Sequence, residues 1–322
     1  YTDGTMLVNH GGTEMGQGLH TKILQVAALE MGIPMGKIRV NATNTSKVPN
    51  TSPTAASSGS DLNGMAVKNA IEKLHQRLEP CARLMLHEQY GLSQKLPVEY
   101  EMGRVFAAGH KDQFITFEAL ATRAHQEKIS MSATGYYSTP GIHFDHQKGK
   151  GKPFHYFAYG MAVSEVEVDI LTGFTKVIHV DIIHDAGESI NPAIDLGQVY
   201  GGFVQGMGWC IMETLRYDDQ GNLLNHSAGT YKIPAIGDTP GYFNAELLSA
   251  APNPGTIRRS KAVGEPPLML ALSVWLAVKD AISSVAHHQL EPYFQLPANN
   301  ELIVRSVKDL RERIKSRSTA GS

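Results

Sequence analysis

One segment constrains the fold of this 322-residue chain more than any other, because it has helical character and is unusually rich in glycine. Asn191-Pro192 suits the start of a helix, which we expect to run to about Met212. The glycines inside it are Gly197, Gly201, Gly202, Gly206 and Gly208. Each glycine in a helix interior costs up to about 1 kcal/mol relative to alanine. The helix is therefore predicted to be buried against another backbone or a ligand, because the missing Cβ atoms permit close approach.

Composition and charge limit the class of protein. Hydrophobic residues make up 42% of the chain, which is enough for a core, and the length suits about two domains. Lys and Arg number 29 and Asp and Glu 31, so the net charge is −2. This balance excludes a strongly basic nucleic-acid binder and an acidic disordered tail. The longest apolar run, residues 268–278, is shorter than the ~20 residues of a membrane span, so we expect no membrane partner.

The two cysteines and the first residue carry further expectations. Cys81 and Cys210 have no CxxC spacing, which argues against a disulfide framework and against an iron–sulfur or zinc site in this chain. A reducing, cytoplasmic location is therefore expected. The chain begins with Tyr1 rather than methionine, so we expect a further part of the protein upstream.

Hydrophobic periodicity and chain breakers predict an α+β fold, with helices packed on mixed sheets. Helices are expected over residues 19–31, 55–78, 117–126, 191–212, 266–284 and 304–315, with a second helical stretch ending near residue 90. Strands are expected as a hairpin in residues 1–10, at 37–40, on either side of the 117–126 helix, as a hairpin of 154–170 with 175–183, and as short pieces up to about 249. Residues 143–152 are expected to form an exposed loop or linker, which divides the chain into subdomains of residues 1–145 and 146–322.

Residues 11–18 form a glycine-rich turn between a predicted strand and a predicted helix. Backbone N–H groups in such a turn, together with the dipole of the helix that follows, make an anion site for a phosphate or pyrophosphate. An ordinary tight turn is the alternative, and Gln17 is either a turn residue or a partner for a heterocycle or phosphate oxygen. A dinucleotide fold is disfavoured, because the third glycine of its fingerprint is missing.

Two other segments suit either a helix start or a site. In residues 52–58, Ser52 or Thr54 would cap the next helix, or this second helix N-terminus would face the same anion. In residues 261–268 two prolines suit the first turn of a helix, and the helix dipole favours Glu265 just before them. The alternative is that Glu265 is a general base beside Gly264 at the edge of a pocket. The histidines within residues 143–146 could suggest a metal site, but a solvated loop is the favoured interpretation.

Four segments taken together resemble the molybdenum hydroxylases, in particular those of the xanthine dehydrogenase and aldehyde oxidase type. They are GGTEMGQGLHTK at residues 11–22, VPNTSPTAAS at 48–57, NPAIDLGQV at 191–199 and KAVGEPP at 261–267. Their order and spacing also match, and the resemblance extends to about residue 282. The resemblance implies the molybdopterin-binding fold of that family, and that this chain is the C-terminal part of its molybdenum-binding region.

The resemblance also implies roles for individual residues. Those expected to bind the pterin and phosphate of molybdopterin are Met15, Gly16, Gln17, Gly18, Thr54, Ser57, Gln198 and Gly264. Ala55 and Ala56 would lie beside the substrate, and Glu265 would be the catalytic base in hydroxylation of an sp2 carbon with oxygen from water. The molybdenum would be held by the cofactor and by no protein ligand. One carboxylate then suffices, because the metal supplies the acidified oxygen nucleophile.

The same resemblance implies partners that this chain does not contain. These are the upstream half of the molybdenum region, 2Fe-2S clusters and FAD on other regions or chains, and an oligomeric assembly. The expected substrate is a purine, with hypoxanthine and xanthine oxidised to urate, and this chain alone is expected to be inactive. Alternatives are hydroxylation of an aldehyde or of an N-heterocycle such as nicotinate, and a non-catalytic cofactor-binding module. Glu265 argues against a non-catalytic module, because a domain that only binds the cofactor needs no general base.

Overall fold

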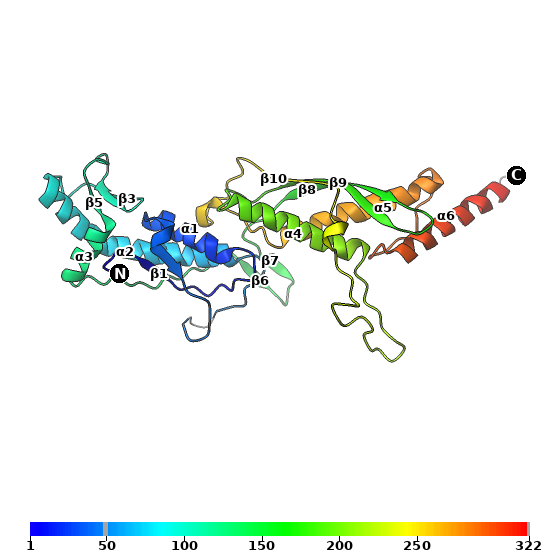
Figure 1. Ribbon diagram of the computed structural model, residues 1–322, viewed down its shortest axis with the longest axis horizontal. Coiled ribbons are helices and arrows are strands. Elements are labelled where there is room, and N and C mark those ends of the chain that lie inside the picture. Colours follow the sequence, from blue (N-terminus) through cyan, green and yellow to red (C-terminus); the bar gives the residue numbers. More distant parts are fainter. Residues whose placement is uncertain (48–50, 321–322) are drawn as a thin grey trace. The chain divides into compact units, whose positions relative to one another are not determined.

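The computed structural model describes residues 1–47 and 51–320, and in it the chain forms two compact units (Figure 1). The first unit contains Tyr1–Phe157, Gly187–Asn191 and Pro252–Ala262. The second contains Ala158–Ala186, Pro192–Ala251 and Val263–Ser322. Residues 146–157 and two later stretches thus belong to the first unit, although the sequence analysis placed them in the second subdomain. The assignment of each half to one part of a cofactor site stays a prediction.

The first unit begins with a β-α-β arrangement. Strand β1 (Met6–Val8) pairs in parallel with β2 (Ile38–Val40), and helix α1 (Leu19–Met31) connects them through the short 3-10 helix η1 (Met35–Lys37). The predicted hairpin in residues 1–10 is therefore wrong. A turn does form, since Gly4 N donates to Tyr1 O at 3.1 Å, but the strand that follows finds its partner beyond α1. Helix α1 has the predicted bounds and ends at Gly32, whose φ of 72° suits glycine.

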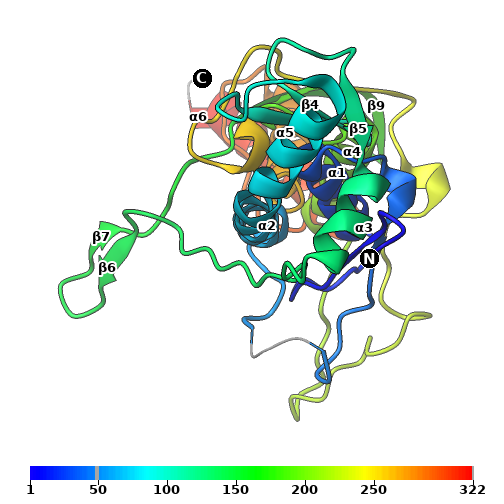
Figure 2. The same ribbon diagram turned by 90° about the vertical axis from the view of Figure 1, so that its left-hand side faces the viewer.

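A long helix forms the centre of the first unit. Helix α2 (Gly59–Tyr90) packs on α1 and on α3 (Phe117–Gln126) (Figure 2). The antiparallel strands β3 (Val98–Glu101), β4 (Arg104–Ala107) and β5 (Phe114–Thr116) form a small sheet that also contacts α2. The two helical stretches predicted over residues 55–90 are one helix, which contains Pro80. Leu78, Cys81 and Leu86 are buried on both sides of this proline. Their packing therefore offsets the lost backbone hydrogen bond.

Residues 143–152, predicted as a loop or linker, form a short exposed hairpin. Strand β6 (His143–Asp145) pairs antiparallel with β7 (Lys150–Lys152). Figure 2 shows this hairpin at the end of an extended segment that leads away from the helices of the first unit. Lys148 forms an exposed ion pair with Asp145 at 3.3 Å.

The second unit is a three-stranded sheet covered by helices. Strand β9 (Thr175–His184) is central, antiparallel to β8 (Gly160–Val168) and parallel to β10 (Tyr242–Leu247). The β8–β9 hairpin was predicted, but of the short strands expected before residue 249 the described residues form only β10 and one isolated bridge, Tyr217 with Leu223. The core residues include Val180, Phe203, Met207, Val274 and Leu310.

The glycine-rich helix packs as predicted. Helix α4 (Pro192–Ile211) lies against the 3-10 helix η4 (Pro266–Ala271). A Cβ atom on Gly206 would stand 2.2 Å from the carbonyl oxygen of Leu268, and one on Gly202 would stand 3.2 Å from Cβ of Pro267. The backbone of η4 therefore occupies the space that side chains would fill, and the prediction of close backbone packing is confirmed.

The apolar segment that begins with η4 is longer than the sequence suggested. Residues Pro266–Ala286, which comprise η4, α5 (Leu272–Ser283) and the 3-10 helix η5 (Ser284–Ala286), contain an 18-residue window with a mean hydropathy of 1.6, and by length and composition alone they could cross a membrane. Ala271, Val274, Val278 and Ile282 are buried at helical spacing and face the core. This one-sided burial is the pattern of a helix that packs within a protein core.

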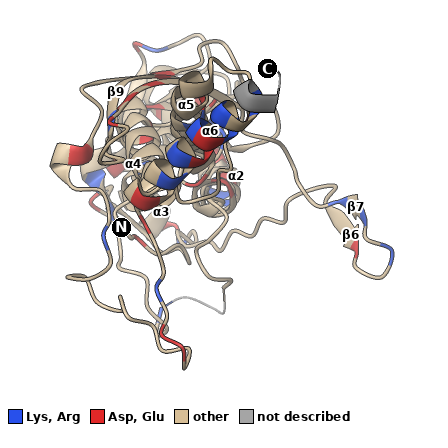
Figure 3. Cartoon of the chain, turned by 90° about the vertical axis from the view of Figure 1, so that its right-hand side faces the viewer, with Lys and Arg blue, Asp and Glu red and all other residues tan. Residues whose placement is uncertain are grey.

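The last helix, α6 (Asn300–Ala320), carries both signs of charge along its length (Figure 3). Ile303, Val307 and Leu310 form its buried face, so the predicted amphipathic helix is confirmed and begins four residues earlier than residue 304.

Candidate active site

The glycine-rich loop of the first unit is organised by its own glutamate. Glu14 Oε1 accepts hydrogen bonds from the N–H groups of Gly16 and Gly18, both at 2.9 Å. Glu14 Oε2 accepts one from His20 N, also at 2.9 Å. Gly16 and Gly18 have φ values of 102° and 76°, which favour glycine. The N–H groups expected to cradle a phosphate thus face the Glu14 carboxylate in this structure, and phosphate binding at the N-terminus of α1 stays a prediction.

The pKa of Glu14 agrees with this geometry. Partial burial raises the pKa of Glu14, but the three backbone N–H groups lower it more, so the pKa of this carboxyl lies below its ordinary value. The role of Glu14 in ordering the loop was not predicted from the sequence. The signal was available, because an acidic residue just before a helix start is the kind of group that the helix dipole favours.

Gln17 is held inside the loop by both ends of its amide. Its Oε1 accepts from Met15 N at 2.5 Å, and its Nε2 donates to Thr13 O at 2.8 Å. Met15 is 67% exposed, and a Cβ atom on Gly16 would have no neighbour within 4 Å. The outer side of the loop at Met15 and Gly16 is therefore open to a ligand that approaches the main chain. Cofactor binding by Met15, Gly16, Gln17 and Gly18 stays a prediction.

The segment before α2 lies against this loop. Thr54 Oγ1 accepts a hydrogen bond from Thr13 N at 2.8 Å, so Thr54 ties the two segments together and does not cap the helix. Helix α2 begins at Gly59, after a turn in which Ala56 and Ser57 have φ values of 55° and 51°. Such conformations cost on the order of 1–3 kcal/mol in non-glycine residues and are concentrated at functional sites.

The starts of α1 and α2 also adjoin, because a Cβ atom on Gly59 would stand 3.1 Å from Leu19 Cδ2. The structure thus brings the glycine-rich loop together with Thr54, Ala55, Ala56 and Ser57, and this juxtaposition agrees with the prediction of two helix starts near one ligand. Residues 48–50 of the same motif lie outside the described residues.

A buried histidine, His10, and a half-buried one, His20, lie beside the loop. The rings of His10 and His20 meet edge to face with centroids 5.0 Å apart, and His10 Nδ1 accepts from Gly12 N at 3.1 Å. Burial, helped by the nearby His20, lowers the pKa of His10 to about 4, so this ring is neutral at pH 7. Since Nδ1 is an acceptor, the proton is assigned to Nε2. This buried Nε2 has no hydrogen-bond partner within the described residues.

The second unit holds the other predicted residues. Glu265 is exposed and directly precedes η4, whose first two residues are Pro266 and Pro267, so the predicted helix start is confirmed. A Cβ atom on Gly202 would stand 3.5 Å from the carbonyl oxygen of Gly264. Gln198 lies one turn before Gly202 on the same face of α4. Gln198, Gly264 and Glu265 are therefore grouped within this unit.

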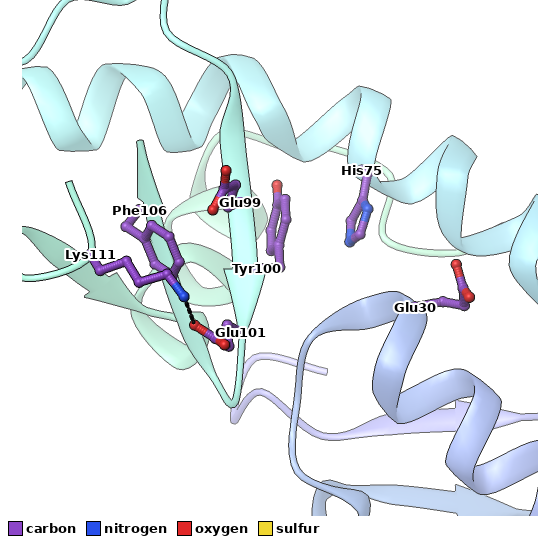
Figure 4. Close-up of a pocket in the computed structure, with 7 residues that line it drawn as sticks. All are labelled: Glu30, His75, Glu99, Tyr100, Glu101, Phe106 and Lys111. Atoms are coloured by element: carbon purple, nitrogen blue, oxygen red, sulfur yellow. Dashed lines mark hydrogen bonds and ion pairs between the residues drawn. The ribbon is translucent and has the colours of Figure 1, made fainter. Parts of the chain in front are cut away.

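A hollow of about 350 Å³ in the first unit is separate from the glycine-rich loop (Figure 4). It is lined by Glu30, His75, Glu99, Tyr100, Glu101, Phe106 and Lys111. The rings of His75 and Tyr100 stack with centroids 4.1 Å apart, and Lys111 pairs with Glu101 at 2.9 Å. None of the predicted site residues lines it. Among the described residues, no group of three or more His, Cys, Asp or Glu side chains could hold a metal ion.

Comparison with known proteins defines the class of this chain. Residues 1–240 match the family model of the molybdopterin cofactor-binding domain, and the chain belongs to this family. The curated proteins to which the chain is similar are xanthine dehydrogenases, which confirms the predicted resemblance to the molybdenum hydroxylases. The chain is 47% identical over 312 residues to the xanthine dehydrogenase/oxidase of Gallus gallus, which covers 96% of this chain and 21% of that protein. It is 46% identical over 291 residues to the xanthine dehydrogenase of Oryza sativa subsp. japonica, which covers 88% and 19%.

The chain thus spans about a fifth of the length of the curated relatives it matches. Solved structures confirm the α+β fold of the molybdopterin-binding domain. Quinoline 2-oxidoreductase from Pseudomonas putida 86 superposes with a TM-score of 0.81 at 24% identity, covering 96% of this chain and 37% of that chain. Aldehyde oxidoreductase from Desulfovibrio gigas superposes with a TM-score of 0.67 at 26% identity, covering 91% and 28%.

Proposed function

We propose that this chain forms part of the molybdopterin-binding site of an enzyme of the xanthine dehydrogenase type. The proposed reaction hydroxylates a purine carbon, from hypoxanthine or xanthine to urate, with oxygen derived from water. The observation that carries the proposal is the position of Glu265. This exposed residue directly precedes η4, and the backbone of η4 packs directly on α4. The family to which the chain belongs and its xanthine dehydrogenase relatives support the assignment.

The residues present suit the cofactor. The outer side of the loop at Met15 and Gly16 is open, and the Gln17 amide and the Thr54 hydroxyl lie nearby as neutral polar groups. We expect the pterin and its phosphate to bind there by exchanging with the hydrogen bonds that Met15 N and Gly16 N now make within the loop. Gln198 and Gly264 are also expected to bind the cofactor. When bound, the cofactor supplies the metal and the electron-accepting centre of the reaction.

The protein's own part in the chemistry falls to Glu265. As a general base, its carboxylate accepts a proton during attack on the substrate carbon. The packing of η4 on α4 fixes the main chain next to Glu265, and this matters because a misplaced base loses most of its effect. Ala55 and Ala56, in the strained turn before α2, would lie beside the substrate, where small side chains leave room for a flat ring.

The further parts of the proposal concern the rest of the protein. We expect the upstream half of the molybdenum region, 2Fe-2S clusters and FAD as partners, in an oligomer. A cytoplasmic location is proposed because Cys81 and Cys210 are both buried free thiols. Hydroxylation of another N-heterocycle is a second candidate, since quinoline 2-oxidoreductase shares the fold closely. Purines, aldehydes and N-heterocycles tested side by side would separate these substrates.

The substitution Glu265→Gln tests the role of the base. In the native protein that carries this chain, we expect hydroxylation to fall by about 10²–10⁴-fold while molybdenum content stays near normal. Glu167→Gln is the matched control, because Glu167 is also exposed and lies in the same unit. Loss of molybdenum together with activity would make Glu265 a structural residue, and unchanged activity would remove it from the mechanism.

A further inference from the structure

A chain of hydrogen bonds ties helix α2 to the main chain shortly before Glu265. The Tyr156 hydroxyl donates to Asp61 Oδ2 and accepts from the N–H group of Ala262 at 2.8 Å. Asp61 lies in the first turn of α2, and Ala262 is the last residue of the first unit before the chain enters the second unit at Val263. All three groups are at least partly buried and belong to the first unit.

The direction of each hydrogen bond is fixed by chemistry. The amide of Ala262 can only donate, and the Tyr156 hydroxyl has one proton, which therefore goes to the Asp61 carboxylate. Burial, followed by the negative charge of Asp61, raises the pKa of Tyr156, so its hydroxyl keeps that proton. A hydroxyl that donates to a carboxylate makes one of the stronger hydrogen bonds in proteins. The chain Ala262–Tyr156–Asp61 is therefore a polarised tether.

A second contact holds the same segment to the same helix. Ile257 is buried and lies against Gly64, where a Cβ atom would stand 3.0 Å from Ile257 Cγ1. Asp61 and Gly64 are three residues apart and so share a face of α2. Between the two attachment points, the Ser260 carbonyl accepts from Thr256 Oγ1 at 2.7 Å and from Asn253 Nδ2 at 3.1 Å. The segment that leads to Glu265 is thus fixed to α2 at two points.

We propose that Tyr156 and Asp61 are positioning residues for Glu265, because they fix the main chain at Ala262, three residues before the carboxylate. The inference rests on the proposed function, in which Glu265 is the base. Glu265 is held on its C-terminal side by the packing of η4 on α4, and the tether holds the chain on its N-terminal side. Val263 is buried in the core of the second unit, so only Gly264 separates the fixed segment from the base.

Tyr156→Phe removes the hydroxyl and keeps the ring, and the native protein that carries this chain is the material to test. Hydrogen exchange followed by mass spectrometry should show two- to about tenfold faster exchange in the peptide around Ala262, because its amide loses its acceptor. We expect kcat to fall by about 10–100-fold with little change in KM and in molybdenum content.

Two further variants make the result specific. Tyr90→Phe is the matched control, because Tyr90 donates its hydroxyl to a main-chain carbonyl, that of Phe114, at 2.9 Å in the same unit. It should leave exchange at Ala262 and kcat unchanged. Asp61→Ala removes the acceptor of the Tyr156 hydroxyl but leaves the hydroxyl itself, so it should change exchange at Ala262 and kcat in the same direction as Tyr156→Phe and by a smaller factor. Asp61→Asn should restore most of the rate, since its amide oxygen still accepts from the hydroxyl. These variants also serve if Tyr156→Phe does not fold.

The outcomes separate the tether from the proposed function. Unchanged exchange at Ala262 in Tyr156→Phe would refute the tether, and faster exchange with unchanged kcat would refute its role in positioning Glu265. If the wild-type protein, with its molybdenum, hydroxylates no purine, aldehyde or N-heterocycle, the proposed function and the positioning role both fail. Hydrogen exchange in the variants would then still report whether Tyr156 holds Ala262.

Discussion

Gly206 of α4 is the position where one added methyl group should disturb the second unit most clearly. A Cβ atom there would stand 2.2 Å from the carbonyl oxygen of Leu268 and 2.9 Å from Cβ of Ala271. Neither atom is the end of a flexible side chain, so η4 must move by about 1 Å to make room, and overpacking of this kind typically costs about 1–3 kcal/mol. The better helix propensity of alanine returns up to about 1 kcal/mol of that cost.

Gly201→Ala is the matched control on the same helix. A Cβ atom at Gly201 would have no neighbour within 4 Å, so this substitution keeps the propensity gain without the clash. The two variants should therefore differ in free energy of unfolding by about 1–3 kcal/mol, with Gly201→Ala the more stable. Because η4 begins directly after Glu265, Gly206→Ala should also lower kcat.

Urea unfolding followed by tryptophan fluorescence is the suitable assay. The two tryptophans, Trp209 and Trp275, lie in α4 and α5, so the signal reports the second unit. An unfolding midpoint of Gly206→Ala equal to or above that of Gly201→Ala would refute the packing argument.

Three further predictions concern the first unit. Gln17→Ala should lower the pterin and molybdenum content of the purified protein, because the amide that orders the loop is lost; full retention with an unchanged rate would leave Gln17 a turn residue. Glu14 has a lowered pKa, so its stabilising effect is present above about pH 4.3 and is lost as the pH falls through the folded pKa. Glu14→Gln should remove this acid-dependent step from urea midpoints followed by circular dichroism, which also reports the helices of the first unit, and an unchanged profile would contradict the Glu14 geometry. Burial raises the pKa of Asp61 to about 6, so the carboxyl destabilises the fold when ionised, and wild-type stability should rise from pH 7 to pH 5 relative to Asp61→Asn. Parallel profiles of these two proteins would show that Asp61 titrates normally.

Local signals in the sequence sufficed where an element ends at its own breakers. Helix α1 has the predicted bounds because Gly18 and Gly32 flank it, and Glu265 precedes a helix because Pro266 and Pro267 fit its first turn. The packing of α4 was also predictable at Gly202 and Gly206, where the missing Cβ atoms permit close contact with η4. For α1 and for the start of η4, the residues that decide the structure are neighbours in the chain.

Long-range partners account for what the sequence analysis missed. Strand β1 pairs with β2, beyond a whole helix, so the turn at Gly4 suggested a hairpin that does not form. Thr54 suited a helix cap, but its hydroxyl accepts from Thr13, 41 residues away. Each error arose because two partners competed for one group, and a local pattern does not show which partner wins.

The molybdenum and pterin content of the native protein, purified through this chain, tests the central claim most directly. Metal analysis together with fluorescence of the released pterin would give both values on one sample. The account predicts about one molybdenum and one pterin for each copy of the chain. Absence of both from an intact protein that contains the upstream region would contradict it, and Glu265 would then be only the residue that begins η4.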